Sequence, residues 1–464
     1  MSADRVSPDR VRASGAAPIE KGRERREGAG RFAGGGTVAV AWLLAALGPL
    51  ASAAQRSGLA DPGQPFDRIR LKSGREVEGR VVHRGPEDWI VRVGTRERSY
   101  ARGEIDTFDS LAARLAHGLK LIETLPTRRS GRPGRTGRFG AVGLHLDVAS
   151  QLRELGLERE AQLVLWTALT ISPGDEAVHT ALGSKRSGTH WLVPVGARPV
   201  PLELARSRAA DWGAAWEFAT THFRLRSNLP LEACLTAAFD LERMYALFYG
   251  LLGEPLDLRE IVEPLEVWVY ADRRAFPEVS GHLGGYFSRQ ENRLHIDASG
   301  GPSRALLAHE ATHQLLFNAA RASRRGDGVL PGWVDEGLAQ YFQAATAGDG
   351  SRLDFRLGSE VEGWLETHRR ASYPFSLSRV LTFTTSDFQG SESRLKYAQA
   401  WSLVQYCLHG EDGALRPGFM AFLAGTLRGR DSAVHFERAL DGAAPDLMEL
   451  EQRWKRWVAG RYGG

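Results

Sequence analysis

The chain has 464 residues, of which 42% are hydrophobic and 25% are charged. This composition is typical of folded proteins and excludes a disordered chain, and the length allows two to four domains. The formal net charge of +4 comes chiefly from arginine-rich stretches at residues 5–31 and 128–138, outside the segments that look folded. We therefore expect no nucleic-acid partner, because nucleic-acid-binding faces interleave basic and aromatic side chains.

An apolar segment stands near the N-terminus. Residues 1–36 are basic, and we expect them to be disordered. Residues 37–54, TVAVAWLLAALGPLASAA, end in small residues, with an A-x-A cleavage site formed by Ala51 and Ala53. This pattern predicts a signal peptide, and its length leaves an uncleaved membrane anchor open. In either case we expect the remaining chain to be exported, in the periplasm or outside the cell, or to face outward from a membrane tether.

Two features are predicted after this segment. Residues 66–106 read as four or five short strands with alternating apolar positions, which predicts a small β-barrel similar to Sm-like barrels. Such modules often bind peptides or nucleic acid, and a stabilising or spacing role is an equal alternative. A helix is expected within residues 107–125, followed by an Arg/Gly-rich linker at residues 126–140.

Residues 141–195 predict a helical hairpin. Apolar residues recur there at helical spacing, and Gly156 and the pair Pro173-Gly174 break the pattern. The segment resembles a single tetratricopeptide repeat. One such unit cannot bury its own apolar face, so we expect the hairpin to dock on a neighbouring domain.

The last domain is expected at residues 211–462, with an α+β fold. Strands are predicted from Thr221 and from Leu265, with an apolar-faced helix between them, and a third strand at residues 292–297. Helices dominate after these strands. This order indicates a small sheet followed by helices, with a sheet edge beside the active site.

A metal-binding motif lies in the segment SRALLAHEATHQLLFNAA, which predicts a helix capped by Ser303. His309 and His313 are four residues apart, so both imidazoles lie on one helix face and can bind one zinc ion. Glu310 is rotated about 100° from His309, away from the metal but beside the cleft. Glu310 is therefore predicted to be the general base that accepts a proton from a zinc-bound water.

A catalytic zinc ion needs a third protein ligand and one position kept for water. Glu336 stands 23 positions after His313, in PGWVDEGLAQYF, where a second helix is predicted to start near Trp333. Two helices packed antiparallel would bring Glu336 to the metal, and Asp335 is the neighbouring alternative. We therefore expect one zinc ion per chain, held by His309, His313 and one of these two carboxylates.

The combination of H-E-x-x-H with W-x-x-E-G-x-A-x-Y resembles the gluzincins, zinc peptidases of the peptidase MA clan. The matching residues of the second motif are Trp333, Glu336, Gly337, Ala339 and Tyr341. The resemblance covers about residues 211–460, which look like a peptidase MA-like domain, and it implies a zincin-like catalytic fold. It also favours Glu336 over Asp335 as the third ligand, with Asp335 as a helix cap or a residue behind the ligands.

The resemblance points to two further residues. Gln340, one turn beyond Glu336, can orient a histidine ring. Tyr397 lies 61 positions after Glu336, and aminopeptidase-like gluzincins place a transition-state-stabilising tyrosine at a similar distance. Tyr397 is thus a candidate oxyanion donor, with a core position in an apolar helix as the equal alternative. Tyr341 and Tyr373 are the fallback candidates.

The expected activity is hydrolysis of a peptide or protein substrate. Aminopeptidase relatives carry a Gly-x-Met-Glu-Asn segment at the substrate edge, whereas this chain has GGYFSRQENRLHIDASGG with Glu291 as the nearby acid. This departure favours an endopeptidase. The alternatives are an inactive envelope binding or scaffold protein that uses the barrel and hairpin, and a zinc enzyme with a non-peptide substrate. Cys234 and Cys407 exclude a disulfide scaffold but allow one long-range disulfide.

Overall fold

The structure, a computed structural model, covers most of the chain beyond the N-terminal segments. It describes residues 63, 65–126, 138–196, 198–277, 284–323, 330–346, 355–430, 432–444 and 446–461. The predicted disordered segment 1–36 and export segment 37–54 lie outside the described residues, as does most of the predicted linker 126–140. No helix within the described ranges is both long and apolar enough to cross a bilayer.

The first folded segment is an antiparallel sheet of five strands, where the sequence predicts four or five. Alternate residues of its first strand are buried, so Ile69 and Leu71 face a small apolar core that belongs to this sheet. The strands pair in the order β4-β3-β2-β1-β5. They are β1 (Asp67–Leu71), β2 (Glu76–Arg84), β3 (Asp88–Val93), β4 (Arg96–Ala101) and β5 (Ile105–Asp109).

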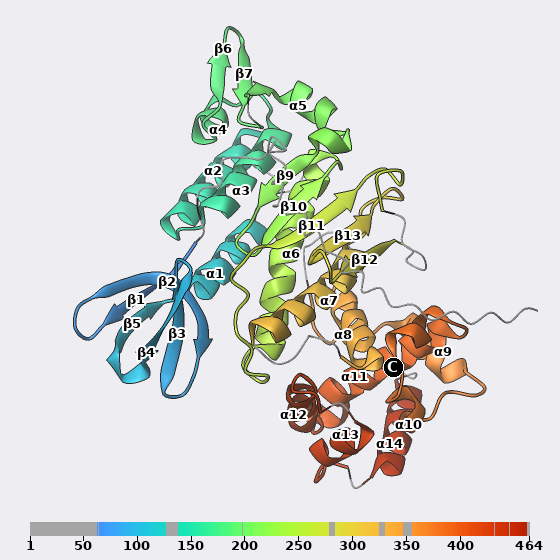
Figure 1. Cartoon of the computed structure of the whole chain (residues 1–464). Coiled ribbons are helices and arrows are strands. Elements are labelled where there is room, and N and C mark those ends of the chain that lie inside the picture. The colour runs from blue at the N-terminus through green and yellow to red at the C-terminus, as the bar shows by residue number, and fades with distance from the viewer. Residues whose placement is uncertain are drawn as a thin grey trace, which may run out of the picture. The chain divides into compact units, whose positions relative to one another are not determined.

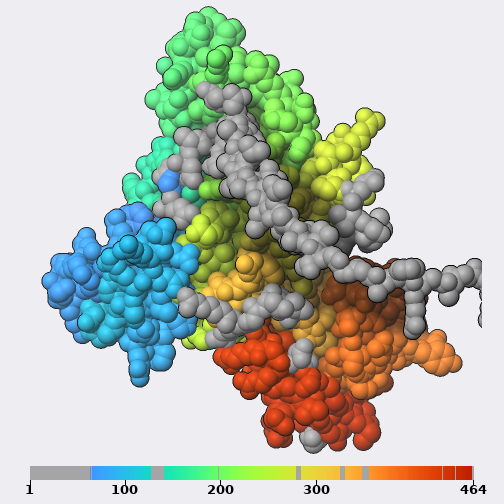
Figure 2. Space-filling view, in the orientation of Figure 1, coloured from blue at the N-terminus to red at the C-terminus, as the bar shows by residue number. Residues whose placement is uncertain are grey.

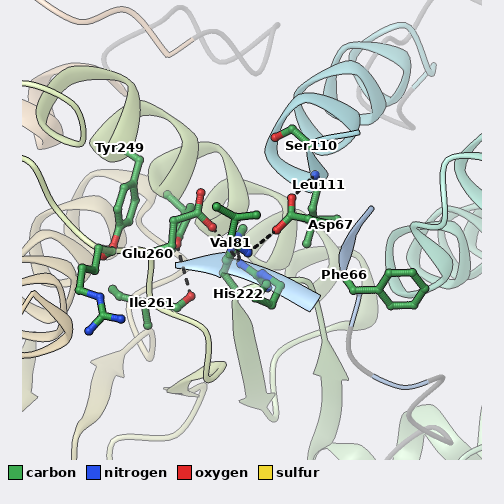
Figure 3. Close-up of polar contacts among 12 residues, drawn as sticks. Phe66, Asp67, Val81, Ser110, Leu111, His222, Tyr249, Glu260 and Ile261 are labelled. Carbon is green, nitrogen blue, oxygen red and sulfur yellow. Dashed lines mark hydrogen bonds and ion pairs between the residues drawn. The ribbon is translucent and has the colours of Figure 1, made fainter. Parts of the chain in front are cut away.

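A buried carboxylate joins this sheet to the helix that follows it. Helix α1 (Leu111–Glu123) begins after Ser110, whose hydroxyl accepts a hydrogen bond from the backbone N–H of Ala113. Asp67 accepts hydrogen bonds from the backbone N–H groups of Val81, at 2.8 Å, and of Leu111, at 2.7 Å (Figure 3). One side chain therefore fixes β1, β2 and the start of α1.

Helices and short strands occupy the predicted hairpin region, residues 141–195, and the segment that follows it. Helices α2 (Arg138–Glu154) and α3 (Glu158–Ile171) are separated by a turn at Gly156, where φ is +71° and glycine is favoured. Short strands follow that the sequence pattern does not predict. The remaining elements here are α4 (Glu176–Ala181), β6 (Lys185–Ser187), β7 (His190–Val193), β8 (Val200–Pro201) and α5 (Leu202–Ala209).

A second sheet lies at the centre of the fold drawn in Figure 1. Its strand order is β12-β13-β11-β10-β9, with β10, β11 and β13 parallel and the two edge strands antiparallel. Helices α6 and α7 cover one face, over buried residues such as Leu225, Val267 and Leu294. The elements are β9 (Trp216–Ala219), β10 (Phe223–Ser227), α6 (Leu231–Leu252), β11 (Leu265–Tyr270), β12 (Gly285–Ser288), β13 (Arg293–Asp297) and α7 (Arg304–Ala322).

Helices make up the rest of the chain. Figure 2 shows them as an orange and red block of side chains beside the yellow segments of the central sheet. They are α8 (Gly332–Ala344), α9 (Glu362–Arg370), α10 (Leu377–Val380), α11 (Ser393–His409), α12 (Arg416–Thr426), α13 (Ala433–Ala439) and α14 (Leu447–Gly460), with single 3₁₀ turns such as η3 (Thr385–Gln389) between them. The described residues thus form a mixed α+β protein, which confirms the predicted fold class at that level.

A buried polar chain joins the first sheet to the second. Arg80 of β2 donates to Nε2 of His222, at 3.2 Å, and to Glu260, at 3.3 Å. On its other side the His222 ring donates from Nδ1 to Glu242 of α6, at 2.7 Å. Because these groups are desolvated, each needs its partner. The first sheet is therefore fastened to the central sheet by specific hydrogen bonds.

The two cysteines do not form the disulfide that an oxidising compartment would permit. Cys234 and Cys407 are both free and fully buried. Burial raises the pKa of the Cys234 thiol to about 12, and it raises the pKa of the Cys407 thiol as well. Both residues therefore act as small apolar core residues.

Candidate metal centre

Helix α7 presents the two histidines of the motif on one face. The Ser303 hydroxyl accepts a hydrogen bond from the backbone N–H of Leu306, so the predicted cap is present at the start of the helix. The imidazoles of His309 and His313 stand edge to face with ring centres 5.0 Å apart. Their Nε2 atoms are 3.3 Å apart. Both nitrogens therefore point at one small volume, as the four-residue spacing predicts.

Helix α8 brings the predicted third ligand to the same place. The Glu336 Oε2 atom lies 3.4 Å from Nε2 of His309 and 3.8 Å from Nε2 of His313. This position depends on Gly337, because a Cβ there would stand 2.8 Å from the carbonyl oxygen of Ala400 on α11. Only a residue without a side chain permits this approach of α8 to α11.

These three side chains can hold a metal ion. One ligand atom from each of His309, His313 and Glu336 lies within 4.8 Å of the other two. Oε2 of Glu336 is buried and makes no hydrogen bond within the described part of the chain, which is costly unless another group satisfies it. Two imidazoles and a carboxylate suit several divalent transition metals, so the ligand set does not by itself select zinc.

Asp335, the alternative ligand, instead supports His313 from behind. Its Oδ1 atom lies 2.9 Å from Nδ1 of His313, and the guanidinium of Arg289 lies 3.7 Å from Oδ2. Burial favours the neutral acid, but His313 and then Arg289 lower the pKa of Asp335 below its usual value. An ionised carboxylate only accepts, so Nδ1 of His313 donates the hydrogen bond and Nε2 faces the ligand cluster.

A proton competes with a metal ion for His313. Burial alone lowers the pKa of His313, but the carboxylates of Asp335 and Glu336 outweigh burial and raise it to about 10. The metal-free site thus favours a protonated imidazole. A metal ion must displace that proton, as is general for histidine ligands.

Glu310 lies beside the cluster but outside the ligand set. It is buried on α7 and faces edge strand β12, since a Cβ built on Gly285 would be 3.1 Å from Cγ of Glu310. Its negative charge contributes to the raised pKa values of His313 and Tyr397. Glu310 therefore stands between the ligand cluster and the sheet edge, as its rotation around the helix predicts.

Tyr397 enters the same site from α11. Burial raises its pKa most, followed by the charges of Glu336 and Glu310 and a hydrogen bond with Glu336. The ring centres of Tyr397 and His309 are 6.5 Å apart, and Phe388 of η3 packs on Tyr397 at 4.9 Å. The hydroxyl is therefore near both carboxylates of the site. Its catalytic role stays a prediction.

The two fallback tyrosines lie elsewhere. Tyr341 is fully buried, and its hydroxyl is 2.8 Å from Nε2 of His409. Tyr373 is 90% exposed. Neither contacts His309, His313 or Glu336 in the described structure, so Tyr397 is the tyrosine of the three that the fold brings to the ligands.

Three further contacts complete the surroundings. Nε2 of Gln340 lies 3.4 Å from Nδ1 of His309, and Oε1 of Gln340 lies 3.1 Å from Nε1 of Trp364 on α9. The acid near the substrate edge, Glu291, is 2.8 Å from Nε2 of His295. The sequence analysis singles out Gln340 and Glu291 as residues near the site. It does not single out Trp364, because the contact between Trp364 and Gln340 joins positions 24 residues apart.

The fold and site define an α+β protein with a buried two-histidine, one-glutamate group that can hold a metal ion. Residues 303–422 match a family profile described as "Protein of unknown function (DUF1570)". The matched region contains the three ligand residues, Glu310 and Tyr397. Searches of curated proteins and of solved structures found no match.

Proposed function

We propose that this chain is an exported zinc-dependent metallopeptidase of the gluzincin type, which cleaves bonds within peptides or proteins. The observation that carries the proposal is the convergence of His309, His313 and Glu336 from two helices, with Glu310 and Tyr397 beside them. A group that merely stabilised the fold would not require an acid and a hydroxyl at its edge. Export rests on the signal-like segment 37–54.

The donor set fits a catalytic zinc ion. His309 and His313 would bind it through Nε2, and Glu336 through Oε2, the buried oxygen that makes no hydrogen bond within the described residues. Three protein ligands are typical of catalytic zinc, whereas structural zinc takes four. When bound, the ion would act as a Lewis acid toward water and toward the carbonyl of the scissile bond.

Glu310 moves the proton during hydrolysis. Its carboxylate accepts a proton from the attacking water molecule and then donates it to the nitrogen of the leaving amine. The bond between carbonyl carbon and nitrogen breaks, and the products are a carboxylate and an amine. The position of Glu310 beside edge strand β12 suits this role, because an extended substrate can pair with a strand edge.

Tyr397 stabilises the negative charge that develops on the carbonyl oxygen. Its raised pKa keeps the hydroxyl protonated, so it can donate a hydrogen bond. Asp335 holds the His313 imidazole through a hydrogen bond of 2.9 Å, and the amide of Gln340 lies beside Nδ1 of His309 at 3.4 Å. A preorganised donor such as the Tyr397 hydroxyl is a large source of rate enhancement.

The test compares the wild-type protein with Glu310→Gln on a peptide library, with metal content measured in both. We expect about one zinc per chain in each, and hydrolysis by the wild type alone, because an amide cannot accept the proton. Glu254→Gln, at an exposed glutamate beyond α6, is the matched control and should remain active. A zinc-loaded wild type that cleaves nothing would favour the binding or scaffold alternative, and activity in Glu310→Gln above a few per cent would remove Glu310 as the base.

A further inference from the structure

Two arginines lie at one end of the edge strand beside the candidate metal centre. Strand β12 is the edge of the central sheet, and alternate residues along it face helix α7. Gly285 faces Glu310, since a Cβ there would be 3.1 Å from Cγ of Glu310. Phe287 packs edge to face on Phe317 of α7, with ring centres 5.3 Å apart. Arg289, the first residue but one after Phe287, continues this side of the strand.

Phe317 holds two guanidinium groups. The guanidinium of Arg289 lies 5.9 Å from the centre of the Phe317 ring, and that of Arg321, one turn further along α7, lies 5.2 Å from it. Cations are attracted to aromatic rings, so this ring keeps both groups near the end of β12. Both arginines are exposed, so a molecule that binds along β12 can reach their charges.

The positive charge at this place has little compensation. Within the described residues Arg321 makes no hydrogen bond or ion pair, and the one ion pair of Arg289 is with Asp335, at 3.7 Å, beyond hydrogen-bonding distance. Asp335 already accepts a hydrogen bond from a candidate ligand histidine. Glu291, the acid of the same turn, pairs instead with His295, at 2.8 Å. An anionic group of a ligand would therefore find donors here that no other group occupies.

The position of the arginines along β12 determines where such an anion would lie. In the proposed reaction the scissile bond lies beside Glu310, which faces Gly285. Arg289 follows Gly285 by four positions, and four residues of extended chain span about 13 Å. When an extended substrate pairs with β12, a side chain about two to four residues from the scissile bond therefore lies near Arg289.

We propose that Arg289 and Arg321 form a subsite that binds a carboxylate of the substrate, about two to four residues from the bond that is cleaved. This inference rests on the proposed function and adds a substrate class to it: peptides that carry an acidic side chain, or their free C-terminal carboxylate, at that distance. A guanidinium can donate two parallel hydrogen bonds to a carboxylate, whereas an amide of the same shape offers a single acceptor oxygen. A lysine at that position is disfavoured, because like charges repel.

The first test measures which peptides the zinc-loaded full chain cleaves. The library consists of ten-residue peptides with acetylated and amidated ends, in which glutamate and glutamine are equally frequent and aspartate is absent. Sequencing of the products gives the residue frequencies around each cut. We expect glutamate to be preferred over glutamine by about 3- to 10-fold at one position two to four residues from the cut, as for a partly exposed ion pair.

Variants of Arg289 separate recognition from a structural effect. Arg289→Gln should lose most of the preference for glutamate, Arg289→Lys should retain part of it, and Arg289→Glu should favour lysine instead. Arg98→Gln, at an exposed arginine of β4, is the matched control and should keep the wild-type preference. The preference compares two substrates of one enzyme, so a general loss of stability or of zinc lowers both rates and leaves their ratio unchanged.

A second library distinguishes the two sources of the carboxylate. Its peptides contain no acidic residue and have free C-terminal carboxyl groups. Cuts that gather two to four residues from the C-terminus, and that lose this pattern in Arg289→Gln, would assign the subsite to the terminal carboxylate. A glutamate preference in the amidated library would assign it to a side chain. Either result supports the inference.

The outcomes separate the inference from the proposed activity. Peptide cleavage without a carboxylate preference, or with a preference that Arg289→Gln keeps, would overturn the inference and leave the peptidase proposal standing. If nothing is cleaved, the same libraries are passed over the immobilised, zinc-loaded chain. Retention of glutamate peptides over glutamine peptides that depends on Arg289 would then support the carboxylate subsite and refute the peptidase proposal. A chain that neither cleaves nor retains peptides would overturn both.

Discussion

Asp335 of α8 accepts a hydrogen bond from Nδ1 of His313 on α7, at 2.9 Å. The contact joins the two helices that supply the ligands, and it fixes which ring nitrogen faces Glu336. Since the sequence offers Asp335 and Glu336 as alternative ligands, this hydrogen bond supports Glu336 as the proposed ligand and Asp335 as the residue that orients His313. Adjacent positions on a helix point about 100° apart, so the two carboxylates approach His313 from different sides.

Asp335→Asn should weaken metal binding by about tenfold, because carboxylates behind ligand histidines typically contribute 10- to 100-fold and an amide retains part of the contact. Chelator competition on the purified protein measures this. Asp272→Asn, at an exposed aspartate in the turn after β11, is the control and should bind like the wild type. An unchanged affinity in Asp335→Asn would mean that the carboxylate does not set the His313 ring orientation.

Tyr397→Phe should lower turnover by about a hundredfold to a thousandfold while metal content stays unchanged, as expected for loss of an oxyanion donor. Steady-state kinetics on any cleaved peptide test this. Tyr341→Phe is the matched control, because the Tyr341 hydroxyl forms its hydrogen bond with His409 and not with the candidate metal ligands. Turnover should survive in that control. Normal turnover in Tyr397→Phe would make Tyr397 a packing residue.

Glu160→Gln should stabilise the protein at alkaline pH. Glu160 is buried on α3 and accepts hydrogen bonds at 2.8 Å from Thr221, and burial, followed by the charge of Glu242, raises its pKa from 4.5 to about 7. Below about pH 4.5 the carboxyl group is protonated in both the folded and the unfolded chain, so it has no effect. As pH rises from about 4.5 to 7 the unfolded chain loses the proton first, so stability falls, by on the order of 3 kcal/mol when complete.

Thermal melting at pH 5 and pH 8.5 measures this effect. The gain in melting temperature of Glu160→Gln over the wild type should be larger at pH 8.5, because the neutral amide removes the cost of ionisation. Glu154→Gln, at an exposed glutamate of α2, is the control and should show no such difference. Equal gains of Glu160→Gln at both pH values would show that Glu160 does not titrate in this range.

Gly337→Ala should destabilise the fold by about 1–3 kcal/mol, because its Cβ would stand 2.8 Å from both the Ala400 carbonyl oxygen and the Val404 side chain. Zinc affinity should fall with it, since Glu336 is the preceding residue. Gly250→Ala, in α6 with no atom near the added Cβ, should instead stabilise the protein by about 0.5–1 kcal/mol. Denaturant unfolding compares the two, and a neutral Gly337→Ala would mean that α8 and α11 separate easily.

Sequence patterns do not predict several of the short strands, and the reason is physical. Strand β9 and strands β6, β7 and β8 have two to four residues each, too few for an alternation of apolar and polar residues to stand out. Their positions depend on pairing with neighbours that are distant in sequence. Longer elements are predictable, because α7 has 19 residues and a cap that the sequence shows directly.

The sequence by itself determined the local geometry of the site. The helical period places His309 and His313 on one face and turns Glu310 aside, and this follows from backbone hydrogen bonds within a few residues. Only the tertiary structure decided which side chains join them. Glu336 reaches the two histidines because Gly337 lets α8 approach α11. Tyr397, rather than Tyr341, lies beside this group because of how α11 packs. Trp364 meets Gln340 through packing between separate helices, which no local pattern encodes.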